Sequence, residues 1–84
     1  MGMEIKFTRG SRKHKVGRDR ARQVLAQPMA ITPIGPAKYL VVGEDLTGRP
    51  LEIIYVLTDV FLVIHVMDLR PRNYDLYEAA KEQP

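Results

Sequence analysis

Residues 38–57 read KYLVVGEDLTGRPLEIIYVL and predict the hairpin around which the rest of the chain is arranged. Two apolar runs, Lys38 to Glu44 and Pro50 to Leu57, have the length and composition of strands. Between them, Asp45 to Arg49 contains the Asp, Thr and Gly residues that favour a tight turn. A third apolar run, Val60 to Met67, follows closely and is apolar on both faces apart from His65. These runs therefore predict antiparallel strands, with the third in a central position.

The segment before this hairpin predicts a strand, two helices and an edge strand. Met3 to Phe7 alternates apolar and charged residues, as a half-buried strand does. A short polar helix is predicted from Arg9 to about His14, and a second helix from Arg18 to about Gln27, where apolar residues form one stripe. The prolines that follow restrict any pairing to Met29 to Thr32, at an edge of the sheet.

The chain after the third strand predicts one more helix, from Tyr74 to about Glu82, with Asn73 as its cap. We expect residues 1–84 to form a single domain, because a chain of this length supports one small core. The order of elements predicts an α+β domain, in which a small antiparallel sheet carries two N-terminal helices packed on one face and a C-terminal helix.

The composition argues against several classes of protein. The chain contains no cysteine and two histidines, so neither a disulfide framework nor a zinc site is expected. We therefore expect a cytoplasmic protein without a metal or cofactor. The longest apolar run is far too short to cross a bilayer as a helix, so no membrane association is expected.

Positive charge is concentrated at the N-terminal end. Residues 1–27 carry eight basic and two acidic side chains, a net charge of +6, whereas residues 28–84 carry five basic and eight acidic side chains, a net charge of −3. A basic segment of this kind attracts polyanions such as RNA, although a solvated helix or loop is equally compatible with it. The candidate RNA-binding residues are Arg12, Lys13, Lys15, Arg18 and Arg22.

The third strand contains a histidine, which raises the question of the direction in which it points. Strand alternation predicts one face with Phe61, Val63, His65 and Met67, and an opposite face with Val60, Leu62, Ile64 and Val66. If the second set forms the core, His65 lies on the other face, beside a partner, a helix or a substrate. A histidine in an apolar strand is also commonly a structural residue with satisfied hydrogen bonds.

Two arginines and a second histidine are the other candidate catalytic residues. Arg70 and Arg72 follow the strand on either side of a rigid proline and can present guanidinium groups to phosphate oxygens. Pairing with nearby carboxylates is an equally good explanation, and the candidates are Asp68, Asp75 and Glu78. His14 can supply a proton donor or acceptor if its loop packs beside the sheet.

Several stretches carry a family resemblance that spans most of the chain: KHKVG at 13–17, RQVLAQP at 22–28, LVVGE at 40–44 and GRPLEIIY at 48–55. In this order and spacing they resemble the BrnT-type toxins of bacterial toxin–antitoxin systems, which have a RelE/ParE-like fold. The family's last strand ends in Ile-Ile-Ser-Ala-Arg, and alignment on Ile64 places His65 at the serine and Met67 at the arginine. His65, Arg70 and Arg72 are therefore the candidates to replace that basic residue.

The resemblance implies a metal-independent endoribonuclease that inhibits translation and is neutralised by a cognate antitoxin protein. It also implies that an RNA 2′-hydroxyl attacks the neighbouring phosphate while side chains move protons and balance charge. RNA and the antitoxin are the expected partners, in a homo-oligomer or a toxin–antitoxin hetero-oligomer. The alternative is a non-catalytic module of the same fold that binds nucleic acid or protein.

Overall fold

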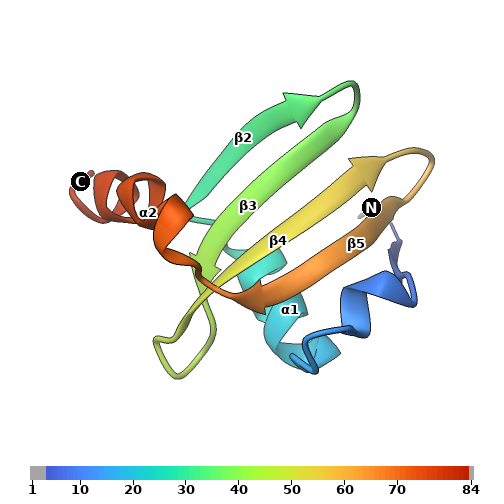
Figure 1. Ribbon diagram of the computed structural model, residues 1–84, viewed down its shortest axis with the longest axis horizontal. Helices are drawn as coiled ribbons and strands as arrows, with labels where there is room; N and C mark the ends of the chain where they lie inside the picture. Colours follow the sequence, from blue (N-terminus) through green and yellow to red (C-terminus); the bar gives the residue numbers. More distant parts are fainter. Residues whose placement is uncertain (1–3, 84) are drawn as a thin grey trace.

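The computed structural model of the protein describes residues 4–83, which form a five-stranded sheet with helices on both sides (Figure 1). The predicted hairpin is present, with β3 over Lys38–Glu44 and β4 over Pro50–Leu57. The two strands are antiparallel, and Val41 lies opposite Ile53. Both strands are rich in β-branched residues, which suit a pleated and half-buried surface.

The turn between β3 and β4 is organised by Asp45. Its Oδ1 accepts hydrogen bonds from the backbone N–H and the hydroxyl of Thr47, at 2.9 and 2.6 Å, and from the backbone N–H of Arg49, at 3.1 Å. Gly48 has φ +85°, a conformation that strongly favours glycine. The Thr47 hydroxyl is the main group that holds the pKa of Asp45 well below its usual range.

The remaining strands extend this hairpin on both sides. β5 (Phe61–Asp68) is antiparallel to β4, and β2 (Ala30–Gly35) is antiparallel to β3. β1 (Ile5–Phe7) pairs with the other side of β5, so that the strand order is β1-β5-β4-β3-β2. The third strand of the prediction is therefore inside the sheet and β2 is at an edge, as expected. The predicted limit of pairing at Thr32 is wrong, because Pro33 and Gly35 also pair with β3. Met3, with which the first predicted strand began, lies outside the described residues.

The prediction of a purely antiparallel sheet is wrong. β1 is parallel to β5, with Ile5 opposite Phe61 and Phe7 opposite Val63. Parallel neighbours need a long crossover, and here most of the chain forms that connection. The apolar pattern of a strand indicates how deeply it is buried, but it does not specify which distant strand becomes its neighbour.

The prediction of two N-terminal helices is also wrong. Among residues 4–83 only α1 (Arg18–Ala26) precedes β2 as an α-helix, and it corresponds to the second predicted helix. The first predicted helix is a single 3-10 turn, η1 (Gly10–Arg12), after which Lys15 adopts φ +59° and redirects the chain. A short polar segment buries too little apolar surface to offset the cost of helix nucleation.

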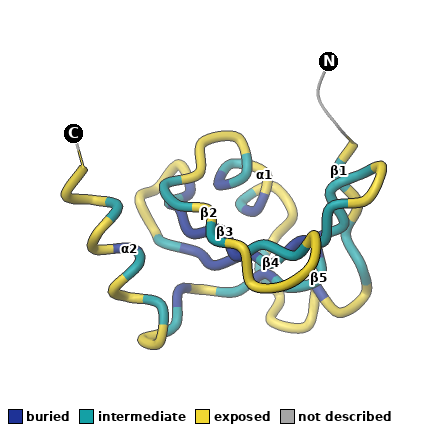
Figure 2. Tube along the Cα trace, turned by 90° about the horizontal axis from the view of Figure 1, so that it is seen from above, coloured by how far each residue is buried: buried dark blue, intermediate teal, exposed yellow. Residues whose placement is uncertain are grey.

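α1 covers one face of the sheet, whereas α2 (Tyr74–Lys81) stands beside the sheet (Figure 2) and packs against residues of its other face. Val24 of α1 is fully buried and packs in one apolar cluster with Val41. Tyr77 of α2 packs in a second cluster with Val42. Neighbouring residues of a strand point to opposite faces, so Val41 and Val42 mark the two sides of β3.

This arrangement contradicts the predicted fold class. The prediction placed helices on one face of an antiparallel sheet in a RelE/ParE-like arrangement, whereas residues 4–83 form a mixed sheet with one short helix before it and one C-terminal helix. None of these helices is both long enough and apolar enough to cross a lipid bilayer.

Candidate active site

A fully buried glutamate lies at the centre of the candidate site. Glu52 is in β4 between Leu51 and Ile53, whose side chains are buried in the sheet. Strand alternation turns Glu52 to the face opposite α1, and its exposed fraction is 0%. A buried carboxylate is costly unless it is paired and hydrogen-bonded, so its partners decide how this part of the chain folds.

The partners of Glu52 all come from the C-terminal end of the chain. Its Oε2 accepts a hydrogen bond from Nε of Arg70 at 2.7 Å, forms an ion pair with Nη2 of Arg70 at 2.6 Å, and lies 3.0 Å from Nε2 of His65. Its Oε1 accepts from the backbone N–H of Arg70 and from Nδ2 of Asn73, both at 2.9 Å. The network therefore ties β4 to the end of β5 and to η2 (Pro71–Asn73).

This network also corrects the role predicted for Asn73. The sequence predicts that Asn73 caps the last helix, and the residue does precede α2. Its side chain makes no capping hydrogen bond, however, and donates to Glu52 instead. A buried carboxylate needs a donor more than an exposed helix end does, because water can satisfy the helix end.

Glu52 is ionised at neutral pH. Burial raises the pKa of its carboxyl, but hydrogen bonds from the side chain and backbone of Arg70, from Asn73 and from His65 outweigh burial and lower the pKa to about 2. Charge-assisted hydrogen bonds of this kind favour the carboxylate over the neutral acid. The site therefore holds a permanent negative charge that is paired with the Arg70 guanidinium.

A bulge in β5 determines the direction of His65. Tyr55 of β4 is opposite Val63, and Ile54 is opposite His65, so Ile64 is an extra residue without a partner on β4. Val63 is fully buried in the core beneath α1, whereas His65 contacts the buried carboxylate on the other face. In a regular strand these two residues, two positions apart, would share one face.

The bulge overturns the predicted faces of this strand. Phe61 and Val63 pack in the α1 core, whereas His65 and Met67, which were predicted to share their face, lie on the opposite side. Val66, from the other predicted set, is 1% exposed and belongs to the α1 core as well. Each predicted face therefore contributes residues to both sides of the sheet.

His14 reaches His65 from the other end of the chain. Thr8 donates its backbone N–H and its hydroxyl to the carbonyl oxygen of Val63, at 3.0 and 3.1 Å, and so holds η1 against β5. The ring centroids of His14 and His65 are 5.7 Å apart, with the planes at 76°. His14 is exposed and the His65 side chain is 19% exposed, so both imidazoles are accessible from solvent.

The two predicted arginines differ in their surroundings. Arg70 is bound to Glu52, but its side chain is still 35% exposed. Arg72 is exposed, and no hydrogen bond or ion pair with the described part of the chain joins it to the cluster. Within the same residues, Arg70 pairs with none of the three carboxylates that the sequence offered: Asp68, Asp75 and Glu78. The site thus brings together His14, His65 and Arg70.

The residues predicted to bind RNA are all exposed: Arg12, Lys13, Lys15, Arg18 and Arg22. They lie in η1, in the loop after it and in α1, on both sides of His14 along the chain. Arg22 makes a cation–π contact with Phe7: its guanidinium carbon lies 5.1 Å from the centre of the Phe7 ring. The neighbouring Arg20 is occupied by Asp45, whose Oδ2 accepts from its Nε at 2.6 Å.

Glu52 is the residue that sequence reasoning missed. It is the one charged side chain in the strand Pro50–Leu57, whose other residues are apolar or aromatic. A carboxylate in such a strand requires a cation or several donors, and Arg70 provides both. The position of Glu52 in an otherwise apolar run was therefore the signal that a buried polar network exists.

The geometry of the cluster permits proton transfer. When the His65 ring is neutral and its proton is on Nε2, Nε2–H donates a hydrogen bond to Glu52. Nδ1 is then the nitrogen that can take up a proton. The imidazole of His14 lies beside this ring and can donate a proton while His65 accepts one.

Within residues 4–83, no three His, Asp or Glu side chains are grouped so that they could hold a metal ion. No protein-family model, curated protein or solved structure matches this chain.

Proposed function

We propose that the protein is a metal-independent endoribonuclease and acts as the toxin component of a toxin–antitoxin pair. The observation that carries the proposal is the meeting of His14 and His65, from opposite ends of the chain, beside the buried Glu52. One histidine is oriented by a carboxylate and the other is exposed, which gives the pair distinct roles in proton transfer. The resemblance to BrnT-type toxins supports the assignment to a toxin.

In the proposed reaction, His65 is the general base and His14 is the general acid. Nδ1 of His65 takes the proton of an RNA 2′-hydroxyl, whose oxygen then attacks the adjacent phosphorus. The bond from phosphorus to the 5′-oxygen breaks, and His14 donates a proton to that oxygen. The products are a 2′,3′-cyclic phosphate and a free 5′-hydroxyl, so no metal, oxidant or further reactant is consumed.

Arg70 and Glu52 support this reaction in different ways. Glu52 is a positioning residue, because it holds the His65 ring and fixes which nitrogen carries the proton. Arg70 directs Nε and one terminal nitrogen at Glu52, and its partly exposed guanidinium can donate to the negative charge that develops on the phosphate. Arg72, exposed in η2, is proposed as an additional phosphate contact.

The basic N-terminal segment is proposed to bind the RNA backbone. Its five exposed side chains flank His14, so phosphates bound there would lie near the histidine pair. Neutralising phosphates releases counterions, and the affinity should therefore fall steeply as salt concentration rises. The cognate antitoxin is proposed to block this surface, in a toxin–antitoxin complex in the cytoplasm.

Cleavage of single-stranded RNA by the purified protein in the presence of EDTA tests the proposal. Replacement of either histidine by alanine should lower the cleavage rate by roughly 10²–10⁴-fold, the usual contribution of one general acid or base. Met67→Ala is the matched control, because Met67 lies on the same strand and the same face as His65 but cannot transfer a proton. Mapping of the ends should show a cyclic phosphate.

Expression in bacteria tests the biological role. The wild-type protein should arrest growth, and His65→Ala should relieve the arrest at equal protein level. Absence of cleavage by the wild-type protein, or cleavage that persists when both histidines are replaced, would refute the enzymatic proposal.

A second candidate function is a non-catalytic module that binds nucleic acid or protein. The observation that favours it is that Glu52 uses both Arg70 and Asn73 to anchor η2 to β4, which is a structural task. Salt-dependent RNA binding without cleavage, unaffected by His65→Ala, would support this module over the nuclease.

A further inference from the structure

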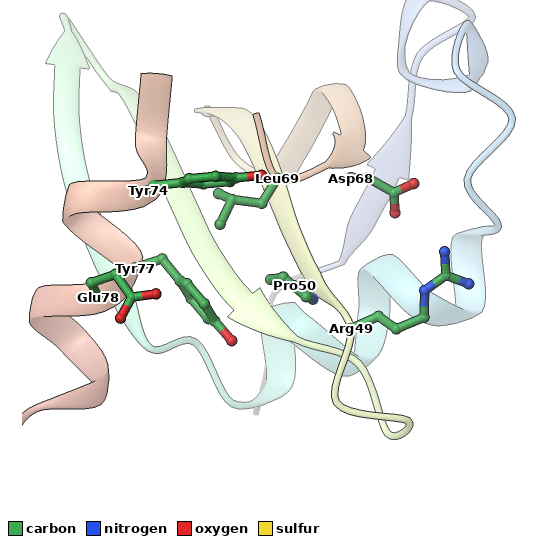
Figure 3. A pocket seen from close by; sticks show the side chains of 7 residues that line it. All are labelled: Arg49, Pro50, Asp68, Leu69, Tyr74, Tyr77 and Glu78. Atoms are coloured by element: carbon green, nitrogen blue, oxygen red, sulfur yellow. The ribbon is translucent and has the colours of Figure 1, made fainter. Parts of the chain in front are cut away.

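A groove lies beside the candidate active site, between α2 and the ends of β4 and β5 (Figure 3). Its volume is about 340 Å³, near the lower end of the roughly 300–1,000 Å³ typical of small-molecule sites. The rings of Tyr74 and Tyr77 line it from α2, and Leu69 and Pro50 lie across from the helix (Figure 3). Two aromatic rings and two apolar side chains suit a flat ligand.

The polar groups of the groove include several that are available to a ligand. Tyr74 is 49% exposed, and Glu78 and Arg49 are exposed as well. Within residues 4–83, the side chains of these three residues make no hydrogen bond or ion pair. The Tyr77 hydroxyl, in contrast, already donates to Glu44.

These groups favour a neutral heteroaromatic ring over an isolated phosphate. Arg49 is the one cationic side chain in the lining, which also includes two carboxylates, Asp68 near Arg49 and Glu78 on α2 at the other end of the groove (Figure 3). A dianion would be repelled by this balance of charge. A nucleobase presents a flat face to Tyr74 and carries donors for a carboxylate and acceptors for a guanidinium along its edge.

The groove lies near the histidine site along β4 and along the segment that follows β5. Pro50 in the groove and Glu52 in the cluster lie on the same face of β4, two residues apart, which is about 7 Å along a strand. Tyr74 directly follows Asn73, which bonds Glu52, and Leu69 directly precedes Arg70, which does the same. The same network therefore positions both the groove and the histidine His65.

We infer that this groove is a subsite for an unpaired nucleobase next to the scissile phosphate, with the base stacked on Tyr74; this assignment rests on the proposed ribonuclease function. The substrate class is then single-stranded RNA, because a base in a duplex is stacked and paired and does not enter the groove. Glu78, four residues after Tyr74 on α2, contacts the edge of the base and gives the site a preference among bases.

Binding can be measured apart from cleavage with the His65→Ala protein and a fluorescently labelled single-stranded RNA octamer. In this background, Tyr74→Ala should weaken binding about tenfold, as is usual for the loss of one base–aromatic stack. Tyr74→Phe should recover most of that loss, since it restores the ring. Leu46→Ala, which removes an 85% exposed apolar side chain from the β3–β4 turn, is the control and should leave the affinity unchanged.

A second measurement uses cytidine and guanosine alone with the wild-type protein. Their addition should shift the amide NMR signals of Leu69, Tyr74 and Glu78. Equal affinity of Tyr74→Ala for RNA, or no shift of these signals at millimolar nucleoside, would overturn the subsite. Nucleoside binding in the groove by a protein that cleaves no RNA would instead refute the nuclease and leave the base site standing.

Discussion

Replacement of the buried Glu52 by glutamine should destabilise the protein strongly at neutral pH. The carboxyl has a pKa of about 2 in the folded protein against an ordinary value of 4.5, and the difference corresponds to roughly 3 kcal/mol of unfolding free energy. Glutamine keeps the shape and one acceptor, but its amide nitrogen faces donors from His65 and Arg70. We expect a loss of about 2–3 kcal/mol, in line with the cost of breaking a buried pair.

The same substitution should change how stability depends on pH. The pKa of Glu52 is lowered on folding, so its contribution is fully present above pH 4.5 and is lost as pH falls toward about 2. At pH 3 roughly half of the contribution remains. The difference between wild type and Glu52→Gln should therefore shrink on acidification.

Urea unfolding at about pH 7, 5 and 3 measures this difference, with circular dichroism as the probe. Glu82→Gln is the matched control, because it neutralises an exposed carboxylate near the C-terminus and should change stability by less than about 0.5 kcal/mol. Equal stability of wild type and Glu52→Gln at pH 7 would show that the network does not hold the fold. A difference that stays constant from pH 7 to pH 3 would show that ionisation of Glu52 is not its cause.

Gly43→Ala should destabilise the protein by about 1–3 kcal/mol in the same urea assay, because the new Cβ would lie 2.9 Å from Cγ1 of the buried Val24. Gly35→Ala is the control and should destabilise it clearly less, because the nearest atom to its new Cβ would be 3.6 Å away. Equal losses of stability would contradict the packing argument. Tyr77 should ionise only near pH 12, because its hydrogen bond to Glu44 raises the pKa of the phenol to about 12. Its contribution to stability is then present below the ordinary value of 10 and lost as pH rises through 12, so Tyr77→Phe should remove about 1 kcal/mol at neutral pH. Phenolate absorbance of the wild type and of Tyr77→Phe, followed as pH rises, measures the ionisation of Tyr77. Ionisation of Tyr77 near pH 10 would contradict this prediction.

The local elements of this fold could be predicted from the sequence to a large extent. The hairpin of β3 and β4, the central position of β5, the edge position of β2 and the two α-helices follow from apolar periodicity and turn residues. What could not be predicted was pairing across the chain. The partner of β1 depends on which strand has a free side, and no residue near Ile5 encodes the presence of Phe61 opposite it.

The candidate site shows the same division. The histidines and Arg70 could be singled out as chemically suited residues, but their arrangement depends on Ile64, which forms a bulge without any glycine or proline to signal it. Arg70 was expected to pair with nearby carboxylates or with phosphate, and its actual partner, Glu52, lies on a neighbouring strand. Long-range side-chain pairing of this kind requires the register of β4 and β5.

The parallel pairing of β1 with β5 has a consequence for synthesis on the ribosome. The first strand leaves the exit tunnel long before its partner Phe61–Asp68 has been translated, so the N-terminal segment must wait without its neighbour. Contacts between such distant residues form slowly, because a long loop must close first. The nascent chain therefore cannot bring His14 beside His65 until Phe61–Asp68 has emerged from the exit tunnel, and the N-terminal part of the candidate site stays without its partner until then.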